Sequence, residues 1–326
     1  MRAIVISKPG GPEVLQYTEV ADVEPQRGEI RVRVRATAVN RADLVQREGR
    51  YPAPAGVPAD IPGLEYAGDV DAVGEAVTDL KVGDKVFGLV GGGSYAEYII
   101  VHSRATSKMP NHLSYEEAAS FPEAFITAYD AMVSQCRLSA GETVLISAAA
   151  SGVGTAAIQI AHAIGARPIG TTRTAAKADR LQEFGLKDVI VNGDTTFAED
   201  VLKLTNGIGV DVTLELVGGE YISQDLQCTA PRGRIVLVGL LAGASCKFNL
   251  GMLLSKRLEL RGTSLRARPL EEKIVIAQTF SKSLVPLIGA GKLKSVIDKT
   301  FPLKDAAAAH EFLGQNESFG KVVLTV

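Results

Sequence analysis

Up to about residue 120, apolar and polar positions alternate in short runs that glycine and proline separate. Alternation with a period of two is typical of strands that bury one face. This part of the chain therefore predicts a small all-β or α+β unit, with strands at 3–7, 29–39, 65–74, 83–90 and 94–101.

The pattern changes at residue 143, where apolar strands begin to alternate with helical stretches. Helices are expected at 154–165, 176–185 and 197–207, and strands at 143–147, 167–172, 188–192, 210–216, 233–240 and 257–265. Six strands joined by crossover helices predict an α/β region with a doubly wound parallel sheet.

The end of the chain returns to the first pattern. A long helix is expected over 270–291, followed by a β-like run at 294–303, a helix at 306–313 and a strand at 320–326. We expect this piece to complete the amino-terminal domain. The predicted domains are therefore residues 1–122 with 267–326, and residues 123–266.

Composition narrows the class of protein. The 326 residues, 46% hydrophobic and 22% charged, suit two globular domains, and a net charge of −2 gives no support to a nucleic-acid partner. The first residues show no targeting segment, and no apolar run reaches membrane-spanning length. Cys136, Cys228 and Cys246 are widely separated, so we expect a cytoplasmic protein with buried thiols and no membrane contact.

The segment 146–166, ISAAASGVGTAAIQIAHAIGA, places a small-residue turn between a predicted strand and a predicted helix. In dinucleotide-binding folds three glycines allow the turn, the approach of the pyrophosphate and close packing of the helix. Here Ala149, Ser151 and Gly154 take those places, with Gly152 and Val153 between. The helix amides still favour an anion, so the segment predicts a dinucleotide site.

The cofactor preference follows from residues about twenty positions further on. NAD-preferring enzymes carry an acid there, which binds the ribose diol. This chain instead has Thr171, Thr172, Arg173 and Lys177. Two cations beside hydroxyls favour a 2′-phosphate and predict NADPH, unless they are only solvated charges at the start of a helix.

Several segments resemble the medium-chain dehydrogenase/reductase superfamily. They are GEIRVRVRATAVNRADLVQREGRYP, PGLEYAGDVDAVG, VGDKVFGLVGGGSYAEY, FPEAFITAYDAM and ASGVGTAAIQIA. More narrowly, the chain resembles the zinc-independent NADPH:quinone oxidoreductases, including the tumour-suppressor-inducible type. The resemblance implies a GroES-like catalytic domain, a Rossmann domain and a homodimer that pairs through the sheet edge around residues 260–265.

The positions that hold zinc in metal-dependent relatives differ in this chain. Asn40 stands where those enzymes have a cysteine ligand, and Leu64 stands where they have a histidine. The cysteines of a structural zinc lobe are also missing beyond residue 90. A catalytic zinc needs three protein ligands, so the resemblance implies a zinc-free member.

Without a metal to polarise a simple ketone, the hydride acceptor must already be electrophilic. A quinone is the expected acceptor. An enone or enoyl group, reduced by the same hydride transfer, is the close alternative. A non-enzymatic NADPH-binding protein, like the relatives that serve as lens crystallins or bind RNA, is the second alternative.

On the substrate side, the resemblance assigns catalytic contacts to Asn40 and Tyr51, and Tyr51 is expected to hydrogen-bond the acceptor or relay a proton. A loop tyrosine packed at a domain edge is the plain alternative. Arg41 and Asp43 suit a structural ion pair equally well, and the role of Glu65 without a metal stays open.

On the cofactor side, the resemblance adds residues to the loop and the cation pair. Thr127 matches a threonine near the nicotinamide ribose, and Asn192 replaces a tyrosine that flanks the adenosine phosphate. Backbone groups near the carboxamide and further cofactor contacts are expected at Gly239, Leu240, Leu241, Ser264, Leu265, Arg266 and Ser318. Packing alone would also explain Thr127, and a plain loop serine would explain Ser318.

Overall fold

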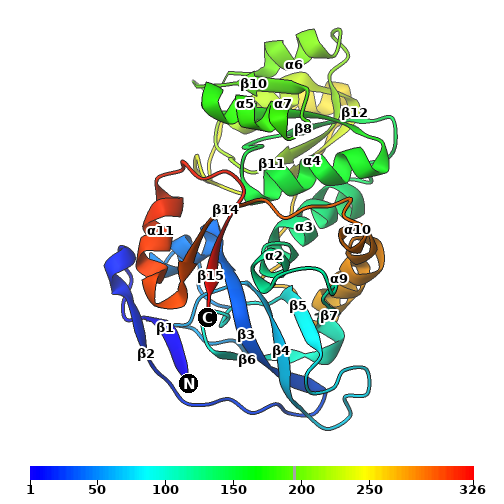
Figure 1. The fold of residues 1–326 in the computed structure, drawn as a ribbon. Helices are drawn as coiled ribbons and strands as arrows, with labels where there is room; N and C mark the ends of the chain where they lie inside the picture. The colour runs from blue at the N-terminus through cyan, green and yellow to red at the C-terminus, as the bar shows by residue number, and fades with distance from the viewer. Residues whose placement is uncertain (194–195) are drawn as a thin grey trace. The chain divides into compact units, whose positions relative to one another are not determined.

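The computed structural model describes residues 1–193 and 196–326 (Figure 1). The chain forms two compact units. Unit 1 contains residues 1–126 and 265–326, and unit 2 contains residues 127–264. The boundaries suggested from the sequence lay after residues 122 and 266. No helix of the described residues has the length and apolarity needed to cross a bilayer.

Unit 1 is built on a seven-stranded sheet in which β14, β15, β3, β4, β5 and β7 are successive neighbours and β6 also pairs with β3. The strands are β3 (Glu29–Val39), β4 (Glu65–Val73), β5 (Lys85–Leu89), β6 (Tyr98–His102), β7 (Ser107–Lys108), β14 (Ile297–Pro302) and β15 (Lys321–Thr325). Strands β1 (Arg2–Ile6) and β2 (Leu15–Glu19) form a separate antiparallel pair. Valine and isoleucine at alternate positions of β3 are buried, as the period of two predicts.

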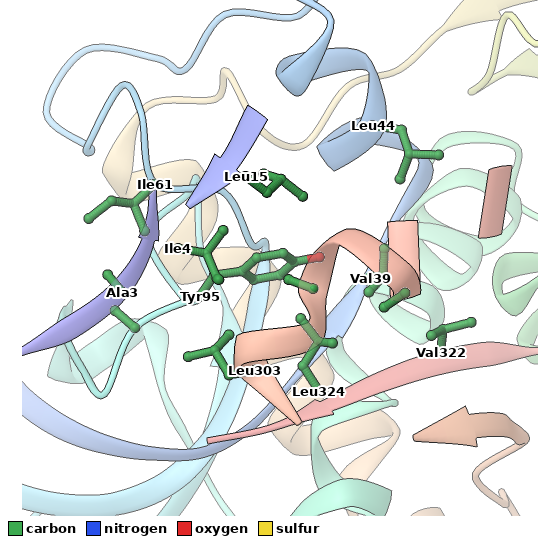
Figure 2. Packing of buried hydrophobic residues seen from close by; sticks show 13 residues of the cluster. Ala3, Ile4, Leu15, Val39, Leu44, Ile61, Tyr95, Leu303, Val322 and Leu324 are labelled. Atoms are coloured by element: carbon green, nitrogen blue, oxygen red, sulfur yellow. The ribbon is translucent and has the colours of Figure 1, made fainter. Parts of the chain in front are cut away.

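The returning end of the chain completes this sheet. Strand β15 pairs antiparallel with β3 and parallel with β14, so it lies between them. Helix α11 (Ala306–Gly314) precedes β15 and packs on the core that Figure 2 shows. The Tyr95 ring lies at the centre of that core, among Ile4, Leu303 and Leu324. The tail is therefore part of the first unit, as its pattern suggested.

The long helix expected over 270–291 is two helices, α9 (Leu270–Ser283) and α10 (Val285–Gly289). Pro286 explains the break, because its ring excludes a backbone N–H and clashes with the preceding turn. The remaining helices of unit 1 are short: α1 (Arg41–Arg47) and α2 (Tyr115–Ala119), with turns of 3₁₀-helix at Pro12–Val14, Ser103–Ala105 and Leu303–Asp305.

Unit 2 contains the predicted parallel sheet of six strands, in the order β10, β9, β8, β11, β12, β13. The strands are β8 (Thr143–Ile146), β9 (Arg167–Thr172), β10 (Asp188–Val191), β11 (Val210–Glu215), β12 (Thr229–Leu237) and β13 (Glu259–Gly262). The order reverses between β8 and β11, and all neighbouring strands pair parallel, as in doubly wound sheets with helices on both faces. The predicted doubly wound fold is thus confirmed.

The helices of unit 2 follow the strands in turn: α4 (Gly152–Ile164), α5 (Ala175–Glu183), α6 (Ala198–Leu204), α7 (Tyr221–Cys228) and α8 (Leu250–Lys256). Helix α3 (Pro122–Tyr129) and a π-helical turn (Asp130–Gln135) lead into β8. In such a sheet, ligands bind beyond the carboxyl ends of the strands, where the strand order reverses. This point lies between β8 and β11.

Candidate functional site

The turn between β8 and α4 brings the predicted loop residues together. Ser151 is the N-cap of α4, and its Oγ accepts a hydrogen bond from the Gly154 amide at 3.1 Å. Ala149 is fully buried, and its amide donates to the Thr171 carbonyl at 2.9 Å. Gly152 and Val153 form the first turn of a helix of 13 residues, where unpaired amides and the helix dipole favour an anion.

Gly154 has a steric reason to be glycine. A Cβ atom at this position would lie 2.4 Å from the Ala149 carbonyl oxygen, closer than real Cβ contacts allow. The helix therefore packs directly on the loop backbone. The position matches the third glycine of the dinucleotide motif, whose function is close packing of helix on strand.

The carboxyl end of β9 carries the predicted cation pair. Thr172 is buried at the strand end, Arg173 is exposed just after it, and Lys177 lies in the first turn of α5. The Thr174 side chain caps that helix by accepting from the Lys177 amide. The structure thus places one buried hydroxyl and two cations at the same strand end.

Asn192 directly follows β10, the strand that pairs with β9, and so lies next to the carboxyl end of β9. Its amide donates to the Thr172 carbonyl at 2.9 Å, and its Nδ2 donates to the Tyr221 hydroxyl at 2.8 Å. Asn192 is 3% exposed, and its Oδ1 has no hydrogen-bond partner among the residues described. Burial raises the pKa of Tyr221, and the Arg173 charge partly opposes that shift. Tyr221, which the sequence did not indicate, thus contacts a predicted cofactor residue.

Glu215 organises the loop that follows β11. Its Oε1 accepts hydrogen bonds from the Val217 and Gly218 amides, the second at 2.7 Å. The Ala242 amide then donates to the Val217 carbonyl at 2.7 Å, which ties the loop after β12 to the loop after β11. Both loops follow carboxyl ends of strands on the same side of the strand-order reversal.

The loop after β12 contains the next group of predicted cofactor contacts. Gly239 must be glycine, since a Cβ there would lie 2.2 Å from the Leu216 carbonyl oxygen. Leu240 and Leu241 follow with about half of their surfaces exposed. Apolar side chains left exposed on a rigid loop are typical of a surface that another molecule covers.

A second buried carboxyl group lies against Glu215. Asp225 on α7 is fully buried and within hydrogen-bonding reach of Glu215. As carboxylates, Glu215 Oε2 and both Asp225 oxygens would have no donor among the described residues. Burial and the Glu215 charge raise the pKa of Asp225 well above its usual value. Burial also raises the pKa of Glu215, but its two backbone amide donors oppose that shift. We therefore assign the shared proton to Asp225, which donates it to Glu215.

Of the other predicted cofactor residues, Thr127, Ser264 and Leu265 lie where the chain passes from one unit to the other. Thr127 on α3 is 6% exposed, Ser264 is exposed, and Leu265 is half-buried. Ser318 lies in unit 1, almost buried, in the loop that leads to β15. Their contacts with a cofactor stay predictions.

In unit 1, Asn40 is the hub of a buried polar cluster. Its Nδ2 donates to Glu65 Oε1 at 2.9 Å and to the Ala38 carbonyl at 3.3 Å, and its Oδ1 accepts from Lys321 Nζ. Lys321 Nζ also bonds Glu65 Oε1 at 2.6 Å, and the Glu123 amide donates to Glu65 Oε2. Both amide protons of Asn40 are thus used, so its predicted contact with a substrate is limited to accepting a hydrogen bond.

Asp43 connects this cluster to a buried histidine. Its carboxylate accepts from the Asn40 and Gly63 amides at 2.8 and 3.0 Å and from the Tyr95 hydroxyl at 3.4 Å. Burial raises the pKa of Asp43 to about 6 and lowers the pKa of His310 to about 3. The neutral His310 accepts from Arg47 at Nδ1, because arginine has no acceptor, and so donates from Nε2 to Tyr95.

Tyr51 is held by Arg266. The Arg266 guanidinium lies 4.8 Å from the centre of the Tyr51 ring, and its Nη1 donates to the Tyr51 carbonyl at 3.1 Å. The same guanidinium donates to the Gly91 carbonyl at 2.7 Å and to Gln46 Oε1 at 2.6 Å. Arg266 is therefore in unit 1 beside a predicted catalytic residue, and its predicted contact with the cofactor stays a prediction.

The positions compared with zinc ligands have other functions here. Asn40 is bonded to Lys321 and Glu65, and Leu64 is buried with an apolar side chain. Within residues 1–193 and 196–326, no group of three or more histidine, cysteine, aspartate or glutamate residues could hold a metal ion. Arg41, weighed earlier as a partner of Asp43, donates to the Leu313 carbonyl and to Asn316 Oδ1.

Sequence reasoning missed Lys321, Tyr95, His310, Asp225 and Tyr221 as members of these clusters. Tyr95 lies in the segment VGDKVFGLVGGGSYAEY, but the resemblance assigned it no function, and the other four lie outside the quoted segments. The one available signal was polar character in an apolar setting, as with lysine before the run VVLTV.

Comparison with known families gives two matches. Residues 26–111 match the model described as alcohol dehydrogenase GroES-like domain, and residues 152–281 match the model described as zinc-binding dehydrogenase.

Among curated proteins, a quinone oxidoreductase from Pseudomonas aeruginosa is 36% identical over 97% of this chain and 96% of its own. A 2-haloacrylate reductase from a Burkholderia species is 32% identical over 99% of this chain and 98% of its own.

Solved structures give the same picture. Escherichia coli quinone oxidoreductase complexed with NADPH has a TM-score of 0.89 and 33% identity, with all of both chains covered. The CurK enoyl reductase has a TM-score of 0.89 and 30% identity over 99% of this chain and 98% of its own.

Proposed function

The chain belongs to the medium-chain dehydrogenase/reductase superfamily, and on this basis we propose that it is a zinc-independent, NADPH-dependent reductase of quinones. The observation that carries the proposal is the chemistry at positions 40 and 64. Asn40 is bound to a buried ammonium, and Leu64 offers no donor atom. A reductase with this donor set needs an acceptor that conjugation has already activated.

NADPH is the cofactor, and unit 2 fits it. The first turn of α4 offers amides to the pyrophosphate, and the close packing at Gly154 lets the phosphates approach the backbone. Arg173 and Lys177 suit the 2′-phosphate. Asn192 Oδ1, which has no partner among the described residues, suits a hydroxyl donor of the ribose. The nicotinamide supplies the hydride when NADPH is bound.

The residues of unit 1 bind and orient the acceptor. Arg266 fixes the Tyr51 ring from one face and from its carbonyl, so the phenol has a defined direction. We assign to the Tyr51 hydroxyl the hydrogen bond to the acceptor oxygen on which negative charge develops. Lys321 and Glu65 hold Asn40 in place. Asn40 Oδ1 accepts from Lys321 and has one lone pair left, which suits a hydroxyl that the acceptor gains on reduction.

An enone or enoyl acceptor is the second candidate. The relatives named as 2-haloacrylate reductase and enoyl reductase are as similar in sequence and length as those named as quinone oxidoreductases. Hydride transfer to an activated alkene needs the same orientation of the nicotinamide. Reduction of an activated alkene differs from reduction of a quinone in the atom of the acceptor that receives the hydride.

A substrate panel tests the function. Purified protein is mixed with NADPH and, in separate assays, ortho-quinones, para-quinones and enones, and loss of nicotinamide absorbance is followed. We expect turnover with quinones and a much lower rate for Tyr51→Phe with unchanged NADPH binding. NADPH binding without turnover of any acceptor would contradict the enzyme and favour the non-enzymatic alternative.

We also propose a homodimer that pairs through strand β13 of the sheet edge. Beside this edge, Leu250 and Leu254 on α8 are 68% and 80% exposed, and Leu260 on β13 is 37% exposed. An edge strand with one side free and exposed leucines beside it is suited to pairing with a second copy. Leu250→Asp with Leu254→Asp should give monomers in analytical ultracentrifugation, while Val82→Asp, also exposed, should not. Monomeric wild-type protein would contradict the proposal.

The proposed location is the cytoplasm. Cys136, Cys228 and Cys246 are free thiols, and two of them are buried. Free thiols are typical of proteins from a reducing compartment. Labelling of the native protein in cells with an ascorbate-peroxidase fusion would test the location.

A further inference from the structure

The side chains of Lys273 and Arg266, both in unit 1, lie against the backbone of Gly91 and Gly92. A Cβ atom built on Gly91 would lie 3.5 Å from Lys273 Nζ, and one on Gly92 would lie 3.6 Å from Arg266 Nη2. Arg266 also bonds the Gly91 carbonyl, and it lowers the pKa of Lys273 by charge repulsion. The guanidinium and the ammonium thus line one patch, which we name the cation patch: Arg266, Lys273, Gly91 and Gly92.

Arg266 is fixed by hydrogen bonds to neutral groups, and no carboxylate among the described residues bonds to it. Its three hydrogen bonds go to neutral oxygens, those of Gly91, Tyr51 and Gln46. A guanidinium has five N–H donors, so two remain. Among the described residues, Asp43 is the carboxylate that acts on Arg266 electrostatically, and it is already bonded to two amides and a phenol.

Lys273 lies where several features disfavour its charge. Burial lowers its pKa, as does Arg266. It is in the first turn of α9, a helix of 14 residues, where the helix dipole opposes a cation. In the described part of the chain it has no ion pair, and the nearby Glu271 is paired with Arg104. A half-buried lysine kept in such a position is typical of a functional site.

Gly91 lies close to the ammonium group of Lys273. A side chain at Gly91 would meet Pro54 and Val57 at 3.4 and 3.3 Å as well as Lys273 Nζ. The φ angle of Gly91 is not in the left-handed region, so backbone conformation does not require glycine there. Glycine at position 91 therefore leaves no side chain between the backbone and the Lys273 ammonium, beside Pro54 and Val57.

We propose that the cation patch is an anion subsite beside Tyr51, and that it binds a carboxylate carried by the hydride acceptor. The inference rests on the proposed reductase function and deepens it. The preferred acceptors are conjugated carbonyl compounds with a carboxylate, and Arg266 and Lys273 would bind that carboxylate by charge-assisted hydrogen bonds. Arg266 then has two functions, since it also orients Tyr51.

The test uses a matched pair of acceptors, trans-3-acetylacrylate and its methyl ester, with NADPH. Wild-type protein should prefer the anion, with a kcat/KM at least about tenfold above that of the ester. Lys273→Gln should lower the anion-to-ester ratio of kcat/KM about tenfold, mainly through KM of the anion, and Lys273→Arg should restore most of it. Levulinate, the saturated analogue, should inhibit wild-type protein better than Lys273→Gln.

Lys282→Gln is the control, because Lys282 is an exposed lysine of the same helix. It should leave the ratio unchanged. Equal kcat/KM for acid and ester in wild-type protein, or equal losses for both in Lys273→Gln, would overturn the anion subsite. Failure of the reductase function itself is distinguishable, since then neither acetylacrylate nor any quinone would be reduced.

Discussion

The carboxyl pair of Glu215 and Asp225 makes the stability of the protein depend on pH. Asp225 is protonated in the folded state, because burial and the Glu215 charge raise its pKa. In the unfolded chain its pKa is about 3.9. Above that pH the unfolded state releases this proton and the folded state keeps it. The stabilisation of the folded state is therefore fully present at low pH and decreases as pH rises towards the raised pKa.

The change Asp225→Asn should remove this pH dependence. The amide keeps a donor towards Glu215 Oε2 and removes the titration. Each pH unit between the two pKa values lowers the stability of the wild-type protein by up to about 1.4 kcal/mol. The free energy of unfolding of Asp225→Asn minus that of wild type should therefore rise from pH 5 to pH 9 by as much as about 1.4 kcal/mol per unit.

Urea unfolding at each pH measures this difference, followed by fluorescence and circular dichroism. Tyr221 and Cys228 lie close to the pair, and burial raises the pKa of each. Both proteins contain these groups, so their titration largely cancels from the difference. Asp179→Asn, at an exposed position of α5, is the control and should give no slope. A difference independent of pH would refute the shared proton.

Three further changes test the sites. Lys321→Met leaves the fully buried Glu65 without its cation and should destabilise the protein by about 3–5 kcal/mol in urea unfolding, whereas the exposed Lys304→Met should not. Arg173→Ala with Lys177→Ala should lower kcat/KM for NADPH about 10- to 100-fold and leave that for NADH nearly unchanged; equal losses would contradict the 2′-phosphate assignment. Gly154→Ala forces a methyl group against the Ala149 carbonyl and should weaken NADPH binding in calorimetry by about tenfold or more. Wild-type affinity for Gly154→Ala would show that the loop can move aside.

Regular patterns along the chain were sufficient to predict the fold. The six strands of unit 2 follow from apolar runs separated by helical periods, and their parallel order follows from the crossovers. The small-residue turn at Ala149–Gly154 could be predicted for the same reason, since its strand and its helix are both evident. The break before Pro286 was available from the sequence as well, and the prediction of one long helix overlooked it.

The buried clusters could not be predicted in this way. Lys321 and Asn40 are 281 positions apart, and only the pairing of β15 with β3 brings them together. Arg266 follows the last strand of unit 2 in the sequence, which suggested a contact with the cofactor. Its side chain also bonds Gly91 and Tyr51 in unit 1, which the sequence did not indicate. Such contacts depend on tertiary packing, for which periodicity carries no signal.

The place of β15 between β14 and β3 has a consequence for biosynthesis. All of unit 2 lies before β15 in the chain, so the ribosome completes unit 2 while the sheet of unit 1 still lacks a central strand. Until Lys321 is synthesised, Glu65 has no ammonium to neutralise it and β3 has a free edge. The nascent chain therefore presents an open, partly apolar sheet edge for the time needed to translate nearly two hundred codons, about 10–40 s at about 5–20 residues per second. During this interval the free edge of β3 would be a binding site for a chaperone.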